Sequence, residues 1–95
     1  NYDSFIKNNS KPVFVKFWAP WCKPCQIMAP RYEEIAKRYE GKLIFTELNI
    51  DKFARFSVLK KVRAVPTVVL YKNGEELDRL TMVLNIKQLD FWANE

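Results

Sequence analysis

Hydrophobic and polar residues follow two different periods along this 95-residue chain. Residues 13–19 are apolar except for Lys16, and such a run is typical of a central strand that is buried on both faces of a sheet. In residues 23–40 the apolar side chains recur every three or four positions, which is the spacing of one helix face. These side chains are Met28, Tyr32, Ile35, Ala36 and Tyr39. Gly41 then provides a helix end, so the pattern predicts a buried strand followed by a long helix.

Shorter elements are predicted on both sides of this pair. Residues 3–9 predict a short helix, and residues 42–50 predict a second strand. Asp51 is placed to cap a short helix. The apolar side chains of that helix are Phe53, Phe56 and Leu59.

The last third of the chain contains a hairpin signal. Asn73-Gly74 stands between two predicted strands, residues 67–71 and 76–83, and favours a tight turn. Asn85 followed by Gln88 resembles a capping box that opens a last helix. The predicted order is α-β-α-β-α-β-β-α. It describes an α/β fold with a mixed sheet flanked by helices, in a single domain over residues 1–95.

Composition and charge narrow the classes of protein. A hydrophobic content of 48% is enough for one small core without a metal or a disulfide staple. With two glycines only, the chain has no phosphate-binding glycine loop, and no apolar stretch is long enough for membrane insertion. The net charge is +5, but the cations are interleaved with acids and no basic–aromatic motif accompanies them. We therefore expect no nucleic-acid partner, and expect the charge to influence the choice of protein partner.

The candidate chemistry lies in Trp21-Cys22-Lys23-Pro24-Cys25, where the buried strand ends and the long helix begins. Two residues between the cysteines allow one helical turn to bring both sulfurs together. The unpaired N–H groups and the positive dipole end of the helix favour a thiolate at the first cysteine, and Lys23 adds a positive charge. Because a thiolate is the attacking species in disulfide exchange, Cys22 is predicted to attack and Cys25 to resolve.

Three other interpretations of the cysteines are less consistent with the sequence. A zinc site needs about four ligands, yet the chain has no histidine and no third cysteine. A structural staple would close too small a loop to stabilise the fold much. An ordinary reduced pair in the core stays open, although a loop-to-helix position beside a lysine is unlike a core site. A redox-active pair is favoured.

Longer motifs resemble those of the thioredoxin family. The run Phe-Trp-Ala-Pro-Trp-Cys-Lys-Pro-Cys at residues 17–25, followed by Met28-Ala29-Pro30, is similar to the active-site segment of thioredoxins. Three more segments fall where the family has similar motifs: Leu48-Asn49-Ile50-Asp51, Val65-Pro66-Thr67 and Lys72-Asn73-Gly74-Glu75. The resemblance extends from about residue 3 to the last residue. It implies the thioredoxin fold, with the family's first short strand missing or truncated.

The resemblance also implies roles for individual residues. Cys22 would be the nucleophile and Cys25 the buried resolving thiol, with no cofactor beyond the redox-active disulfide that they form. Val65-Pro66 would be a cis peptide bond facing the cysteines, whereas the sequence position alone suits an ordinary trans turn. The implied substrate groove consists of Trp21, Pro24, Val65, Pro66 and Met82. Trp18 is similar to a tryptophan behind the site, although a core aromatic explains it equally well.

Three positions depart from the family's pattern. Lys23 stands where thioredoxins usually have glycine. Met82 also stands near a usual glycine at the groove, so a narrower and more apolar groove is expected. Lys16 stands where the family usually has a buried aspartate behind the second cysteine, and Glu47 stands where a lysine commonly pairs with that aspartate. We expect the pair to be exchanged in sign, because a lone buried ammonium would be costly. Alternatively, Lys16 reaches the surface through its long stem.

An exchanged pair would alter how the second cysteine loses its proton. A charged Lys16 cannot accept the Cys25 proton, so Glu47 would take it through water. The nearby positive charge would favour the Cys25 thiolate.

These observations predict a thiol–disulfide oxidoreductase, most consistent with reduction of disulfide-containing protein substrates. The family implies a thioredoxin reductase as partner, and we expect a monomer. A cytoplasmic location is expected, or a secreted or organellar one if a leader has been trimmed. Two alternatives stay open. One is a secretory-pathway disulfide oxidase or isomerase, because Ala19-Pro20-Trp21-Cys22 also resembles such domains. The other is a thioredoxin-fold binding subunit of a larger assembly.

Overall fold

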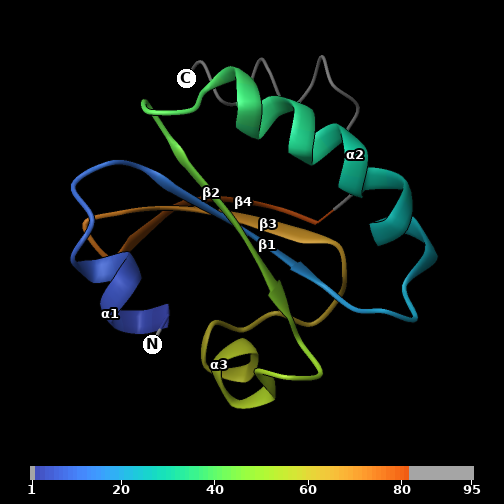
Figure 1. Ribbon diagram of the computed structural model, residues 1–95. Helices are drawn as coiled ribbons and strands as arrows, with labels where there is room; N and C mark the ends of the chain where they lie inside the picture. The colour runs from blue at the N-terminus through green and yellow to red at the C-terminus, as the bar shows by residue number, and fades with distance from the viewer. Residues whose placement is uncertain (1, 82–95) are drawn as a thin grey trace.

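The structure is a computed structural model that describes residues 2–81. Within these residues each predicted element is present, in the predicted order and with bounds that differ by a few residues (Figure 1). The elements are α1 (Tyr2–Lys7), β1 (Val13–Trp18), α2 (Lys23–Arg38), β2 (Ile44–Asn49), α3 (Ala54–Leu59), β3 (Thr67–Lys72) and β4 (Glu75–Leu80). The predicted last helix and Met82 lie outside the described residues.

The four strands form one mixed sheet in the order β2-β1-β3-β4. β1 is parallel to β2 and antiparallel to β3, and β3 is antiparallel to β4. β1 therefore has a strand on each side, and all its residues but the last are buried, as the apolar run predicted. The mixed sheet flanked by helices agrees with the predicted fold class.

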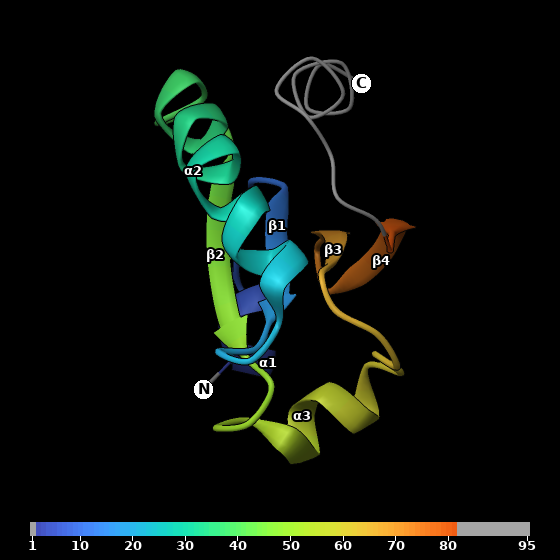
Figure 2. The same cartoon turned by 90° about the vertical axis from the view of Figure 1, so that its right-hand side faces the viewer.

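Alternate residues of β1 supply two separate cores, because successive side chains of a strand point to opposite faces. On one face Phe14 and Val68 pack against the apolar stripe of α2. On the other face Val13, Val15 and Phe17 pack with Ile6 of α1. Figures 1 and 2 show this arrangement, with α2 on one side of the sheet and α1 and α3 on the other. Lys16 has the same parity as Phe14 and so belongs to the α2 side.

The hairpin between β3 and β4 forms at the predicted turn. Asn73 has φ 54° and Gly74 has φ 85°, so both central residues are in the left-handed region that a two-residue hairpin of this type requires. A β-carbon at Gly74 would lie 2.9 Å from the side chain of Lys7, so close packing against α1 also favours glycine here.

The prediction for α3 was wrong in two respects. Phe53, not Asp51, is the N-cap residue, and no side chain caps the helix there. Leu59 is exposed, whereas Phe56 and Ser57 face the protein. A serine fills this buried position because its hydroxyl donates to the Phe53 carbonyl at 3.0 Å, which satisfies its polar group without water.

Within residues 2–81 we find no helix with the length and apolar content that spanning a bilayer demands.

Candidate active site

The two cysteines lie where the carboxyl end of β1 leads into α2. Cys22 is the N-cap residue of α2, with extended backbone angles of φ −89° and ψ 105°. Its Sγ accepts the backbone N–H of Cys25 at 3.2 Å, which satisfies one of the free donors of the first turn. The Cα atoms are 5.3 Å apart and the two residues form a disulfide. The pairing that the motif predicted is therefore present.

The disulfide is more buried than the sequence suggested. Cys22 is 4% exposed and Cys25 is 2% exposed, and both pack with Ala19, Ile50 and Val65. The expectation that this position is unlike the core was therefore wrong for the sulfur atoms. It holds for the neighbouring side chains, because the three other residues of the motif are exposed: Trp21, Lys23 and Pro24.

Val65 contacts Cys22, and the bond between Val65 and Pro66 is cis, as the resemblance implied. The Sγ of Cys22 lies 3.6 Å from the Val65 carbonyl oxygen. In the disulfide this sulfur carries no proton, so the approach is a contact. In the reduced protein a thiol at the same place can donate to that carbonyl. Pro66 itself is buried at the start of β3.

Asp51 is part of this site, although the sequence indicated only a helix cap. Its Oδ1 accepts the indole N–H of Trp21 at 3.4 Å. Its own backbone N–H donates to the side chain of Asn49 at 2.8 Å, which holds the turn after β2. A residue 30 positions away therefore orients the exposed Trp21. No local pattern could have indicated this contact.

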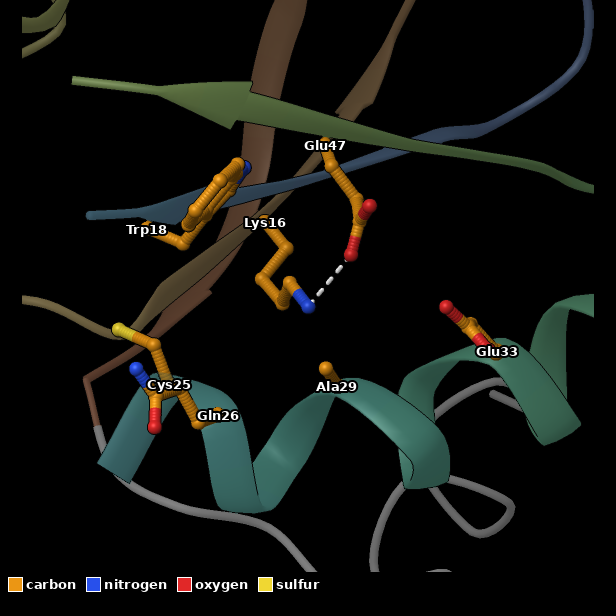
Figure 3. A pocket seen from close by; sticks show the side chains of 7 residues that line it. All are labelled: Lys16, Trp18, Cys25, Gln26, Ala29, Glu33 and Glu47. Atoms are coloured by element: carbon orange, nitrogen blue, oxygen red, sulfur yellow. Dashed lines mark ion pairs between the residues drawn. The ribbon is translucent and has the colours of Figure 1, made fainter. Parts of the chain in front are cut away.

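A cavity of about 150 Å³ lies behind Cys25, between α2 and the sheet (Figure 3). Its lining consists of Lys16, Trp18, Cys25, Gln26, Ala29, Glu33 and Glu47. Figure 3 shows the Lys16 ammonium pointing from β1 toward α2, above Ala29, with the carboxylate of Glu47 next to it. The cavity brings one cysteine of the pair, one cation and two acids together.

Lys16 and Glu47 form the ion pair that the sequence predicted. The Lys16 Nζ and the Glu47 Oε1 are 2.5 Å apart. The two residues are direct neighbours in the parallel register of β1 and β2, so both side chains lie on the α2 face. Lys16 is 2% exposed and does not reach the surface, whereas the Glu47 side chain is 42% exposed. The surface alternative for Lys16 was wrong.

Tyr32 of α2 completes the surroundings of Lys16. The Lys16 Nζ lies 5.0 Å from the centre of the Tyr32 ring, within the range of a cation–π contact. The Tyr32 hydroxyl lies 2.8 Å from the Thr46 carbonyl and 3.1 Å from that of Phe14. Burial, and secondarily the charge of Glu47, raises the pKa of Tyr32 well above its usual value, against the opposing effect of the Thr46 hydrogen bond. In the sequence Tyr32 was only one member of the apolar stripe.

The site thus contains the predicted residues in two groups. The Val65 carbonyl contacts Cys22, whose motif neighbours Trp21, Lys23 and Pro24 are exposed, whereas Lys16 and Glu47 line the cavity with Cys25. Between residues 2 and 81, the structure brings together no set of three or more His, Cys, Asp or Glu side chains that could hold a metal ion.

Known proteins resemble this chain over most of its length. The family model for Thioredoxin matches residues 1–95. A thioredoxin of Buchnera aphidicola subsp. Baizongia pistaciae is 41% identical over 93 residues, which cover 98% of this chain and 85% of that protein. A thioredoxin of Rickettsia bellii is 35% identical over 94 residues, which cover 99% of this chain and 90% of that protein.

A chloroplast relative is longer. Thioredoxin M5, chloroplastic, of Oryza sativa subsp. japonica is 42% identical over 76 residues, which cover 80% of this chain and 44% of that protein. The chain thus spans less than half the length of this relative.

Proposed function

We infer that this chain, which belongs to the thioredoxin family, is a thiol–disulfide oxidoreductase that reduces disulfides in other proteins. The observation that carries this inference is the Cys22–Cys25 disulfide at the amino-terminal end of α2, in contact with the backbone of Val65. A disulfide that closes so small a loop contributes little to stability. Its position at a helix N-terminus suits reversible exchange instead.

Cys22 is the attacking residue in this proposal. In the reduced protein its thiolate would keep the N–H of Cys25 as a hydrogen-bond donor and would lie at the positive end of the α2 dipole. Lys23 is exposed beside it and adds a positive charge. All three effects favour the thiolate, which is the species that attacks a disulfide.

Reduction of a target proceeds in two exchanges. The Cys22 thiolate attacks one target sulfur and forms a mixed disulfide, while the other target sulfur leaves as a thiolate and takes a proton from water. The Cys25 thiolate then attacks the Cys22 Sγ, re-forms the Cys22–Cys25 disulfide and releases the second target thiolate. The target gains two electrons and this protein loses two.

The target would bind over the Cys22 side of the disulfide. Trp21 and Pro24 are exposed in the same motif, and Val65, which precedes Pro66 and β3, contacts Cys22. A target sulfur that approaches from this side meets an apolar frame next to the Cys22 Sγ. Met82, the fifth residue of the predicted groove, lies outside the described residues, and its role stays a prediction.

Lys16 and Glu47 assist the second exchange from the other side. A buried ammonium in the same cavity as Cys25 favours the thiolate form of that cysteine. Glu47 is partly exposed and can take the Cys25 proton through water, because the cavity of about 150 Å³ has room for a water molecule next to the Lys16 ammonium and the Glu47 carboxylate. Lys16 thus acts in two ways: its charge favours the Cys25 thiolate, and its ion pair positions the Glu47 carboxylate.

Insulin reduction with two serine variants tests the assignment. Cys22→Ser should abolish turnover without any covalent adduct. Cys25→Ser should abolish turnover but accumulate a mixed disulfide with the target, visible on a non-reducing gel, because the resolving thiol is missing. An adduct in Cys22→Ser alone would reverse the two roles. Full turnover in both variants would refute the proposed activity.

The direction of electron flow is part of the proposal. A reductase should have a reduction potential near the roughly −270 mV of thioredoxin, whereas a strong disulfide oxidase lies near about −120 mV. The measured potential therefore separates our proposal from the oxidase alternative. A thioredoxin reductase as electron donor and a cytoplasmic location remain predictions, supported by the family resemblance alone.

A further inference from the structure

The positive charge of this protein is concentrated in one stretch of the chain. Residues 51–66 contain five Lys or Arg and one acid, Asp51. The rest of the chain contains eleven Lys or Arg and ten acids. Nearly all of the net charge of +5 therefore belongs to residues 51–66.

This segment lies beside the disulfide. β1 and β2 are parallel, so their carboxyl ends, which lead to Cys22 and to Asp51, lie at the same end of the sheet (Figures 1 and 2). The hydrogen bond from Trp21 to Asp51 links the beginning of the segment to the active site. The contact between the Cys22 Sγ and the Val65 carbonyl links its end. A protein that presents a disulfide to Cys22 therefore comes close to residues 51–66.

Most of these cations are available to a partner. Four of them are exposed and form no ion pair with any of residues 2–81: Lys52, Arg55, Lys61 and Arg63. The segment is held in place from the inside, because Arg79 of β4 donates to the carbonyls of Lys60 and Lys61 at 2.6 and 3.0 Å. The exposed charges are thus carried on a segment whose backbone is anchored to the sheet.

Two exposed aliphatic residues lie among these cations. Val58 is 73% exposed and Leu59 is 70% exposed, on the outer side of α3. A nucleic-acid backbone would gain binding energy from the cations but little from these two aliphatic side chains. A protein surface with carboxylates around an apolar patch would gain from both.

We propose that Lys52, Arg55, Lys61 and Arg63, together with Val58 and Leu59, form a basic docking surface that selects target proteins with acidic residues around the disulfide. The inference rests on the proposed function, because the docked target must deliver its disulfide to Cys22. Opposite charges at the encounter raise the association rate, and the effect falls with ionic strength. The surface therefore determines which disulfides are reduced fastest, and the cysteines determine the chemistry.

Two disulfide peptides test the proposal. They share length and disulfide loop, and differ only in flanking residues, which are aspartates in one and lysines in the other. The wild-type protein should reduce the acidic peptide with a kcat/KM about tenfold higher at low ionic strength. This ratio should approach one at about 0.5 M NaCl, where charges are screened within a few ångströms.

A matched pair of variants localises the effect. The near-side variant carries Lys52→Glu, Arg55→Glu, Lys61→Glu and Arg63→Glu. The far-side control carries the same change of charge at four exposed lysines that flank the opposite end of the sheet: Lys11→Glu, Lys37→Glu, Lys42→Glu and Lys72→Glu. The acidic-to-basic ratio should invert in the near-side variant and change less than about twofold in the control, because screening weakens distant charges. Circular dichroism verifies that both variants are folded.

Several outcomes would overturn the docking surface. These are equal kcat/KM values on the two peptides in the wild type, a ratio that salt does not change, and a far-side control that loses the preference as fully as the near-side variant. Salt-sensitive binding of an RNA oligonucleotide without a peptide preference would do the same. If the near-side variant does not fold, Lys52→Gln with Arg63→Gln provides the same comparison with a smaller perturbation. If the wild type reduces neither peptide, the proposed function fails, and not the docking surface alone.

Discussion

The two sides of the disulfide have different surroundings. On the front, which is the Cys22 side, Cys22 contacts the backbone of Val65 and is flanked by exposed residues of its own motif. On the back, Cys25 lines a cavity that contains the buried Lys16 ammonium. Except for Lys23, the front is assembled from residues that match the thioredoxin motifs. The back carries Lys16 and Glu47, at positions where thioredoxins usually have the opposite charges. In the mechanism that we propose, the two halves of the exchange reaction therefore depend on different parts of the fold. Target recognition and attack would depend on the loops, and resolution would depend on the cross-strand pair.

The largest expected difference between the two sides is in thiol reactivity. In the reduced protein, iodoacetamide near neutral pH should label Cys22 about a hundredfold faster than Cys25, because the Cys25 N–H and the positive end of the α2 dipole favour the thiolate at the N-cap. Peptide mapping by mass spectrometry measures both rates. Faster labelling of Cys25 while Cys22 is still free would mean that the back of the site, not the front, carries the attacking sulfur.

A smaller effect is expected on stability when the pair behind Cys25 is broken. Glu47→Gln leaves the buried Lys16 charge without its partner and should lower the free energy of unfolding by about 1–3 kcal/mol. Lys16→Met should cost less than about 1 kcal/mol, because the remaining Glu47 carboxylate is partly hydrated. The double variant should therefore be clearly more stable than the sum of the two single changes predicts.

Glu33→Gln is the matched control for this cycle, since Glu33 lines the same cavity on α2 and is not in the Lys16–Glu47 ion pair. It should change stability by less than about 0.5 kcal/mol. Urea unfolding at constant pH measures all four variants. Strict additivity would mean that the interaction between Lys16 and Glu47 adds nothing to the free energy of unfolding. Lys16 would then not position Glu47.

The smallest expected effect appears at alkaline pH and involves Tyr32. Burial, with a smaller contribution from Glu47, raises the pKa of Tyr32 in the folded protein, so above about pH 10 the unfolded chain loses this proton first. The stabilising contribution of the protonated hydroxyl is complete below that pH. It is lost as pH rises toward the folded-state pKa, at up to about 1.4 kcal/mol per pH unit.

Tyr32→Phe should remove this contribution to the fall of the free energy of unfolding with pH. Tyr39→Phe, at the end of α2, should leave that fall unchanged. Denaturant unfolding between pH 9 and about 11 compares the three proteins, a range that brackets the ordinary tyrosine pKa. An unchanged slope in Tyr32→Phe would show that the alkaline loss of stability comes from other groups.

Local patterns in the sequence were enough to predict the helices and strands and the position of the Cys22–Cys25 pair. The apolar run of β1, the helical stripe of α2 and the Asn73-Gly74 turn each depend on neighbouring residues, and all three formed as predicted. The short α3 was predicted less well. Six residues provide less than two helical turns, so the packing of Phe56 against Phe17, not periodicity, decided which side faces inward.

The sequence by itself determined that this chain alternates strands and helices and that two cysteines meet at a strand-to-helix junction, because these features arise within a few residues of the chain. The tertiary structure decided that Lys16 meets Glu47 and that Cys22 contacts Val65, which only the family resemblance had led us to expect, and that Trp21 meets Asp51, which nothing in the sequence indicated. These partners are 30 to 43 positions apart. They come together because β1 pairs with both β2 and β3, and a strand register one residue different would send Glu47 to the opposite face of the sheet from Lys16.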